Sequence, residues 1–249
     1  MTLLTNEIHV QKDPRNSTII FAADRRISIG NKFHSNRKKI FEIQYLNAGI
    51  GYFGLAEVHH RNKAMSMSEW LPQFITNNNS IKSLEVFSSA LQAELNSIVP
   101  KNIKTSNPSG FHIAGFNKSK LPEFWFVRNI KSMDGFSYKD LMDHYEITED
   151  FLSRDAIKNS FGIHSLKTFQ PYIQTYRNGD IRAHVVAWER LDSIIGDFLT
   201  LPDFRKLNTL TEYEEFIKFK MILISSIYKK YCNKSIIGTP IDVFSILPK

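Results

Sequence analysis

Three residues, Thr2, Asp24 and Lys39, have side chains that could perform nucleophilic chemistry together. Threonine at the second position is small enough for a bacterial methionine aminopeptidase to remove Met1, which would leave a free α-amine beside the Thr2 hydroxyl. One residue would then supply both the nucleophile and its general base. Lys39 would lower the pKa of that hydroxyl if its ammonium group lay close by. Taken singly, each residue is better explained without chemistry, as a start residue, a charge at a strand end and a surface lysine.

A predicted hairpin at the start of the chain would bring two of these residues together. Residues 2–11 and 18–23 are rich in apolar and β-branched residues, and the turn signal KDPRNS separates them. Pairing across this turn folds position 24 back toward the first few residues. We therefore expect Asp24 to lie across from Thr2, with Lys39 at the start of the next predicted strand.

The order of the predicted elements indicates antiparallel sheets covered by helices. Four strands precede two helices, two more strands follow, and long helical patterns come before a closing strand, which differs from the alternation of a parallel βαβ fold. The further predicted strands are residues 38–45, 48–53, 110–116, 122–129 and 240–247. The predicted helices are residues 57–71, stopped by Pro72, and residues 83–98, 181–199 and 214–232.

The composition is that of an ordinary folded protein in a reducing compartment. Of the 249 residues, 42% are hydrophobic and 23% are charged, which favours one globular domain over a disordered chain. Cys232 is the only cysteine, so no intramolecular disulfide can form, and a cytoplasmic location is expected. The sequence has neither a basic, apolar leader nor an apolar stretch long enough to cross a membrane, so we expect no membrane partner.

The charge pattern and the missing motifs argue against several kinds of ligand. The net charge is +7, but the basic residues are scattered and carry no interleaved aromatic stripe, so no nucleic-acid partner is expected. His59 and His60 are neighbours that would point in different directions on a helix, and no HExxH motif is present, so no metal site is expected. The sequence also contains no P-loop, GxGxxG or GxSxG motif.

Two short patterns in the first part of the chain occur together. An AAD-x-R sequence ends the predicted strand at Asp24, and a KKIFEI strand then leads through a glycine-bearing turn. Together they form FAADRRISIGN…RKKIFEIQYLNAGIGYFGLAE, which resembles the N-terminal third of proteasome-type subunits. The segments FHIAGFN…EFWFVRN and IIGTPIDVFSI resemble that family's central hairpin and closing strand. The resemblance is good over about residues 18–60, patchy to about residue 130, and almost absent over residues 131–235.

The resemblance implies the α+β fold of the N-terminal nucleophile (Ntn) hydrolases. This fold is a four-layer αββα sandwich, in which helices flank two stacked antiparallel sheets. Residues 1–249 would form a single proteasome-like domain, with a divergent helical region at about residues 131–235. In that region the family's short turn rich in glycine and serine is not found, and a longer helical segment replaces it.

The resemblance also assigns roles to individual residues. Asp24 matches the family's active-site aspartate, Lys39 its lysine, and Gly54 the glycine whose amide helps to form the oxyanion hole. Thr2 is the only threonine that removal of Met1 could expose. Tyr52 would lie near the base of the substrate pocket and narrow it, although packing in the core explains it equally well.

Two spacings differ from those of catalytic proteasome β subunits. Asp24 and Lys39 are 15 positions apart, one fewer than in those subunits and equal to the spacing in non-catalytic α subunits and Anbu-type bacterial homologues. Thr2 and Asp24 are 22 positions apart, several more than in β subunits. The first hairpin must therefore be longer or bulged, or Thr2 lies beyond the site.

Three hypotheses about function follow. The first is a threonine hydrolase that cleaves peptide or small amide substrates without a metal or organic cofactor. The second is a catalytically inactive, proteasome-like scaffold or assembly subunit. The third is a ligand-binding protein on the same fold. Because proteasome-like subunits assemble into rings, the resemblance also implies a homo-oligomer.

Overall fold

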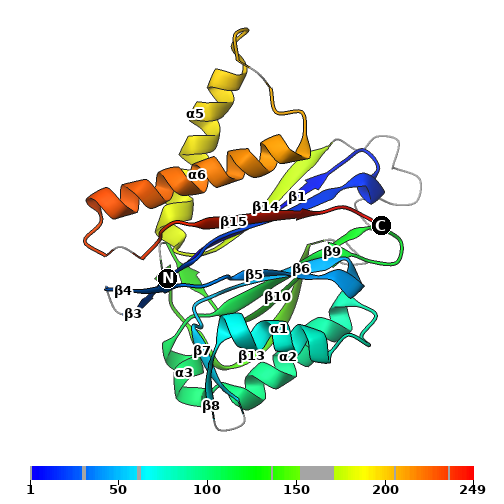
Figure 1. Ribbon diagram of the computed structural model, residues 1–249, viewed down its shortest axis with the longest axis vertical. Coiled ribbons are helices and arrows are strands. Elements are labelled where there is room, and N and C mark those ends of the chain that lie inside the picture. Colours follow the sequence, from blue (N-terminus) through cyan, green and yellow to red (C-terminus); the bar gives the residue numbers. More distant parts are fainter. Residues whose placement is uncertain are drawn as a thin grey trace.

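The computed structural model describes residues 2–29, 32–60, 63–135, 137–151, 171–204, 206–234 and 236–249. Within these ranges the chain has an α+β structure in which helices pack against antiparallel sheets (Figure 1). The region 131–235, predicted to be divergent, is only partly described, because residues 136, 152–170, 205 and 235 lie outside the described residues.

A four-stranded sheet contains the first and the last strand of the chain. Its strands have the order β14-β1-β2-β15, and every neighbouring pair is antiparallel. The strands are β1 (Leu3–Val10), β2 (Thr18–Asp24), β14 (Tyr172–Gly179) and β15 (Ile241–Ile246). β1 and β2 form the predicted first hairpin, which a short 3-10 turn at Pro14–Asn16 closes.

A five-stranded sheet faces the first one. Its order is β13-β10-β9-β6-β5, again with antiparallel neighbours. The strands are β5 (Ile40–Ile43), β6 (Ala48–Phe53), β9 (Gly110–Phe116), β10 (Pro122–Ile130) and β13 (Leu141–Phe151). Three short hairpins lie outside the two sheets: β3 (Arg26–Ile29) with β4 (Lys32–Asn36), β7 (Glu57–His60) with β8 (Lys63–Ser66), and β11 (Met133–Asp134) with β12 (Ser137–Tyr138).

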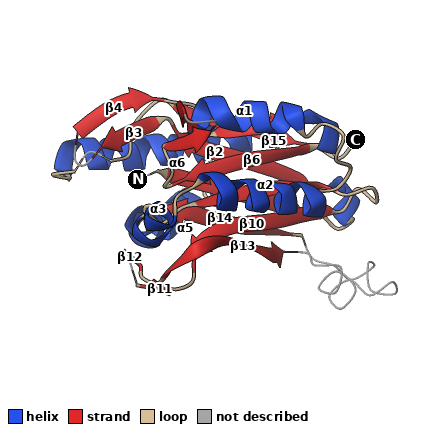
Figure 2. Cartoon of the chain, turned by 90° about the horizontal axis from the view of Figure 1, so that it is seen from below, coloured by secondary structure: helices blue, strands red, loops and turns tan. Residues whose placement is uncertain are grey.

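Helices lie beyond the outer face of each sheet. α1 (Met67–Asn77), α2 (Leu84–Ile98) and α3 (Lys101–Ser106) lie on the side of the five-stranded sheet, where Figure 2 shows α1 and α2 side by side. α6 (Leu210–Tyr231) lies across the four-stranded sheet, and α5 (Glu189–Leu199) extends away from it (Figure 1). A π-helical segment, η4 (Ala183–Trp188), leads into α5. None of the described helices has the length and apolar character needed to cross a lipid bilayer.

Three apolar clusters hold these elements together. One joins side chains of the two sheets, including Leu4 and Ile8 of β1 with Phe124 and Phe126 of β10. A second lies between the five-stranded sheet and helices α1 and α2. The third lies between the four-stranded sheet and the segment from η4 to α6. β1 is buried along its whole length because it has a covered face on both sides.

The predicted helix over residues 57–71 is wrong in its first half. Residues 57–66 instead form the β7–β8 hairpin, in which Glu57 is exposed, Val58 is buried and His59 is exposed, the alternation of a strand. The helix begins only at Met67, after a capping box. In this box the Ser66 side chain accepts from the backbone N–H of Glu69, and the Glu69 carboxylate accepts from the backbone N–H of Ser66.

The predicted helix stop at Pro72 is also wrong. α1 continues through Pro72 to Asn77. Leu71, Phe74 and Ile75 are buried against the core on both sides of the proline, and this packing outweighs the backbone hydrogen bond that a proline in a helix lacks.

Other predicted elements agree with the structure. The strands at residues 38–45, 48–53, 110–116, 122–129 and 240–247 correspond to β5, β6, β9, β10 and β15. The helix over residues 83–98 is α2, and Ser83 caps it by accepting a hydrogen bond from Val86 N. Strands β13 and β14, within the region predicted to be divergent and helical, were not predicted.

Candidate active site

Asp24 and Lys39 form an ion pair that is completely shielded from solvent. Both residues are 0% exposed, and Lys39 Nζ lies 3.1 Å from Asp24 Oδ1. Lys39 also donates a hydrogen bond to the carbonyl oxygen of Arg26 at 2.6 Å. Burying a charge is unfavourable unless it is paired and hydrogen-bonded, so these contacts offset the lost hydration of the ammonium group.

Donors from neighbouring segments surround the Asp24 carboxylate. Leu3 N and Lys39 Nζ donate to Oδ1 at 2.7 and 3.1 Å. Arg26 N and Gly238 N donate to Oδ2 at 3.2 and 3.4 Å. Because every one of these groups is an N–H donor, the ionised carboxylate is the form that fits this environment.

Burial shifts the pKa of each partner in the direction that favours its neutral form. Loss of solvent raises the pKa of the Asp24 carboxyl, and the charge of Lys39 and the backbone N–H groups of Leu3 and Gly238 act in the opposite direction. Loss of solvent lowers the pKa of the Lys39 amine, and Asp24 opposes that shift. Both partners of Lys39 Nζ, the Asp24 carboxylate and the Arg26 carbonyl oxygen, are acceptors, so the ammonium form fits this environment. An ammonium group lowers the pKa of a hydroxyl that lies close to it.

The register of the first hairpin explains how the chain start meets this pair. Leu4 pairs with Ala23, so Leu3 lies across from Asp24 and Thr2 lies one residue further. The pairing runs without a register shift back to the turn. The first hairpin is therefore longer rather than bulged, and it places Thr2 one residue beyond the position opposite Asp24.

Thr2 is held through its backbone at the entrance to β1. It is 4% exposed, and its carbonyl oxygen accepts a hydrogen bond from Asp180 N at 2.8 Å. Gly179 lies against the same carbonyl with φ +101°, and a Cβ there would lie 1.9 Å from the Thr2 oxygen, so only glycine fits. Among the residues that the structure describes, no hydrogen bond joins the Thr2 hydroxyl to Lys39, whose partners are Asp24 and Arg26.

Polar side chains between the sheets fix the turn that carries Gly179. The His112 ring contacts Asn6 Oδ1 through Nδ1 at 2.7 Å and Asn178 Nδ2 through Nε2 at 2.8 Å. Tyr138 donates to Asn178 Oδ1 at 3.0 Å and accepts from Gly179 N at 2.8 Å. Burial lowers the pKa of His112 to about 3, so the ring is neutral, donating from Nδ1 and accepting at Nε2.

Gly54 lines a cavity of about 400 Å³. It follows β6 with φ +82°, and a Cβ there would lie 1.9 Å from the carbonyl oxygen of Pro108. Within the described chain, its backbone N–H has no hydrogen-bond partner. The cavity is lined by apolar side chains, including Leu55, Val58 and Val99, and by the basic or titratable side chains of His34, Arg37 and His59.

Several residues that line the cavity are close in sequence to the residues of the buried ion pair. Its residues Ile27 and Ser28 directly follow Arg26, whose carbonyl oxygen accepts from Lys39. Its residue Arg37 lies two positions before Lys39. Gly54 and the ion pair therefore belong to one region, although Thr2 does not itself line the cavity.

Tyr52 lies in the core and is not among the residues that line this cavity. Its ring packs against that of Phe111 with centroids 6.3 Å apart, and its hydroxyl donates to the carbonyl oxygen of Lys38 at 3.3 Å. Burial raises the pKa of the hydroxyl well above its usual value. The structure thus gives Tyr52 the packing role that the sequence also allowed.

Sequence reasoning missed Gly179 and Asp180. Asp180 is buried, and besides its contact with Thr2 its carboxylate accepts from the backbone N–H groups of Arg182 and Ala183, which begin the following helical segment. The Asn-Gly-Asp sequence is a turn and helix-start signal that could have identified the position. This signal does not by itself point to Thr2, because only the pairing of β14 with β1 brings the turn to the start of the chain.

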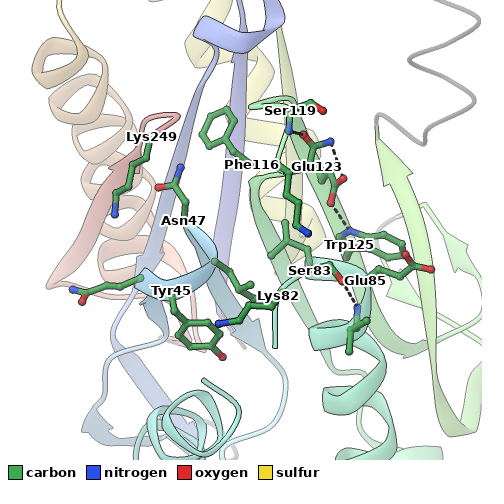
Figure 3. Close-up of a pocket in the computed structure, with 16 residues that line it drawn as sticks. Tyr45, Asn47, Lys82, Ser83, Glu85, Phe116, Ser119, Glu123, Trp125 and Lys249 are labelled. Carbon is green, nitrogen blue, oxygen red and sulfur yellow. Dashed lines mark hydrogen bonds between the residues drawn. The ribbon is translucent and has the colours of Figure 1, made fainter. Parts of the chain in front are cut away.

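A larger cavity, of about 1020 Å³, is separate from this region (Figure 3). The aromatic side chains of Tyr45, Phe116 and Trp125 line it, together with Lys82 and Lys249. The Glu123 carboxylate is already engaged, because it accepts from the Asn117 side chain at 3.0 Å and from the indole N–H of Trp125 at 3.4 Å. The two cavities share no lining residue, so the larger one contributes nothing to the candidate site.

The described part of the chain contains no group of three or more histidine, cysteine, aspartate or glutamate side chains that could hold a metal ion. A comparison of the chain with models of known protein families finds no match, and a comparison with curated proteins finds no match either.

Proposed function

We propose that this chain is a threonine hydrolase of the Ntn type, which cleaves a peptide or small amide after Met1 has been removed. The observation that carries the proposal is the completely buried Asp24–Lys39 pair beside the start of the chain. A buried ion pair is a poor device for stability, because apolar residues of similar size often stabilise a core as well or better. A buried lysine with a lowered pKa and a specific charged partner is a sign of a functional site.

The proposed fold is the four-layer αββα sandwich of that superfamily. Its support is the pair of antiparallel sheets joined by one apolar cluster, with α1 and α2 packed on one outer face and α6 on the other. Further support comes from the N-terminal strand, whose start lies beside the candidate lysine.

In the proposed reaction, the Thr2 hydroxyl attacks the carbonyl carbon of an amide. The α-amine of Thr2, directly or through a water molecule, accepts the hydroxyl proton and then delivers it to the leaving amine as the C–N bond breaks. Water hydrolyses the resulting ester, which releases the acid and restores Thr2. Lys39 keeps the hydroxyl pKa low, and Asp24 holds Lys39 in position.

Gly54 would stabilise the negative charge that develops on the carbonyl oxygen. Its N–H has no partner among the described residues and lies beside the 400 Å³ cavity, so it is free to donate to an oxyanion. The cavity is the proposed site for the acyl side chain of the substrate, with its apolar walls binding the hydrocarbon part.

The test is turnover of a library of peptidyl-aminocoumarin amides by protein shown to lack Met1. We expect Thr2→Ala to lose at least 100-fold in rate and Thr2→Ser to keep measurable activity. Thr5→Ala is the matched control, because the buried Thr5 hydroxyl has no partner among the described residues and lies three positions further along the chain, in β1. Turnover by Thr2→Ala equal to that of the wild type would show that Thr2 is not the nucleophile. No turnover by the Met1-free wild type would instead favour the inactive scaffold.

A further inference from the structure

Helix α5 is an amphipathic helix whose apolar side the described chain covers only in part, since Leu191 packs against the cluster beneath α6. None of its 11 residues is buried. Ile194 is 55% exposed and Phe198 is 48% exposed. Figure 1 shows α5 extending from the body of the molecule beyond α6.

The contacts that hold α5 are mostly at its beginning. Asp192 bonds to Lys220 of α6 at 2.6 Å, and Glu189 bonds to Arg177 of β14 at 3.2 Å. Toward its end, Phe198 packs against Phe204 of the loop that follows, with ring centroids 5.4 Å apart. An isolated helix of this length is marginally stable in water, so an unburied apolar face favours a further packing partner.

Helix α6 has an exposed apolar stripe of its own. Phe219, Ile222 and Ile227 lie on its solvent side although its other face is buried against the four-stranded sheet. The exposed residues Lys218, Lys229 and Lys230 flank this stripe, and α6 has no acidic residue after Glu215. The surface is therefore apolar at its centre and basic at its margins.

The charges of α5 complement those of this surface. Of the acidic residues of α5, Glu189 and Asp192 are already paired with Arg177 and Lys220 of the same chain. The exposed Asp197 lies beside the exposed Phe198, so the outer half of α5 presents an acidic and apolar surface to the basic and apolar face of α6. Two copies can satisfy both surfaces at once if they are related by a two-fold axis, because each copy then gives α5 and receives α5.

We infer that α5 of one copy packs on the exposed face of α6 of a second copy of this chain, and reciprocally. Ile194 and Phe198 lie against the stripe of Phe219, Ile222 and Ile227, and Asp197 lies near Lys229 or Lys230. This surface uses neither the candidate active site nor its cavity, so the inference stands independently of the proposed hydrolase activity.

The first test is the mass of the full chain in solution, measured by light scattering and sedimentation velocity over a range of concentrations. We expect the wild type to be a dimer or a larger assembly built from dimers. The double variant Ile194→Ser/Phe198→Ser should halve the mass or weaken association at least 100-fold, because apolar anchors at the centre of an interface carry most of its energy. Both side chains are exposed in the single chain, so the fold should survive, which circular dichroism checks.

Met133→Ser and Val86→Ser provide the control, since both side chains are at least as exposed as Phe198 but lie on β11 and α2. They should leave the mass unchanged. A second arm reverses charges: Asp197→Lys should weaken association, and combining it with Lys229→Asp and Lys230→Asp should restore it. A monomeric wild type, or an Ile194→Ser/Phe198→Ser variant that associates like the wild type, would overturn the inference, and a partner of another kind would then have to cover α5.

Discussion

At the scale of single residues, the most unusual feature is a lysine that has lost all contact with water. Lys39 has two acceptors, Asp24 and the carbonyl oxygen of Arg26. Asp24 in turn depends on Lys39 for its only side-chain cation among the described residues. The two residues therefore form a unit, and changing one alters the environment of the other.

Removing the lysine side chain alone should strongly destabilise the fold. Lys39→Ala leaves the Asp24 carboxylate buried without its cation, and breaking such a pair costs about 3–5 kcal/mol. Lys38→Ala removes the neighbouring exposed lysine and should change the free energy of unfolding by less than about 0.5 kcal/mol. Urea unfolding monitored by fluorescence measures both values. Equal stability of the two variants would show that the pair contributes nothing to the fold, contrary to its geometry.

The parts of this site that depend on contacts close in sequence could be predicted from the sequence, and the parts that depend on long-range pairing could not. The proximity of Asp24 to the chain start followed from the hairpin, and the structure brings Leu3 N to its carboxylate. Lys39 could be assigned only through the resemblance, because nothing in its own neighbourhood distinguishes it from a surface lysine. Asp180 lies far from Thr2 in the sequence, and only the pairing of β1 with β14 brings the two residues together.

At the scale of elements, two buried histidines link the segments around the site. His112 of β9 bridges Asn6 of β1 and Asn178 of β14, and His184 of η4 contacts the carbonyl oxygen of Asn178 at 3.0 Å. Burial lowers the pKa of His112 to about 3 and that of His184 to about 4, from an ordinary value of 6.5. Both rings are thus neutral in the fold at pH values where the unfolded chain binds protons.

The free energy of unfolding should therefore decrease as the pH is lowered below about 6.5. Between that pH and about 4, the unfolded chain binds a proton at each histidine that the fold does not, so each lowers the free energy of unfolding by up to about 1.4 kcal/mol per pH unit. Below about pH 4 the folded protein also begins to take up protons, first at His184. Thermal melts across pH 4 to 8 measure the slope.

A variant at each kind of histidine identifies the source of this slope. His184→Gln should reduce the slope by the contribution of about one bound proton. His144→Gln should not reduce it, because His144 is exposed and its carboxylate neighbours Asp143 and Glu146 raise its pKa, the opposite direction. A slope that His184→Gln leaves unchanged would mean that the buried ring is not the group that titrates.

Elements with a strong local pattern were predicted well, and those formed by long-range pairing were not. α2 has both a cap and a helical apolar face, and β1 with β2 has a turn signal between apolar runs. The residues of β7 and β8 fit a helical spacing as well as the alternation of a strand, because short apolar patterns are compatible with both periods. The exposed or half-buried residues of β14 give little apolar alternation to recognise.

At the scale of the whole molecule, the order of the elements was sufficient to predict antiparallel sheets with helices. The order cannot show how far each helix is covered. α5 has the pattern of a helix with an apolar side, and such a pattern usually predicts burial within the same chain. An apolar helix side can pack within the same molecule or against another molecule, and the sequence pattern is the same in both cases. The exposure of α5 in the structure favours the second case.

The central claim is that Thr2 is the nucleophile, and mass spectrometry of the untagged protein tests it most directly. The intact mass is measured before and after reaction with a β-lactone, and peptide fragmentation locates the adduct. We expect a chain that lacks Met1 and gains one acyl group on Thr2, with no adduct on the Thr2→Ala variant. A chain that retains Met1 quantitatively, or a Met1-free chain that gains no adduct or carries it on another residue such as Cys232, would contradict the claim.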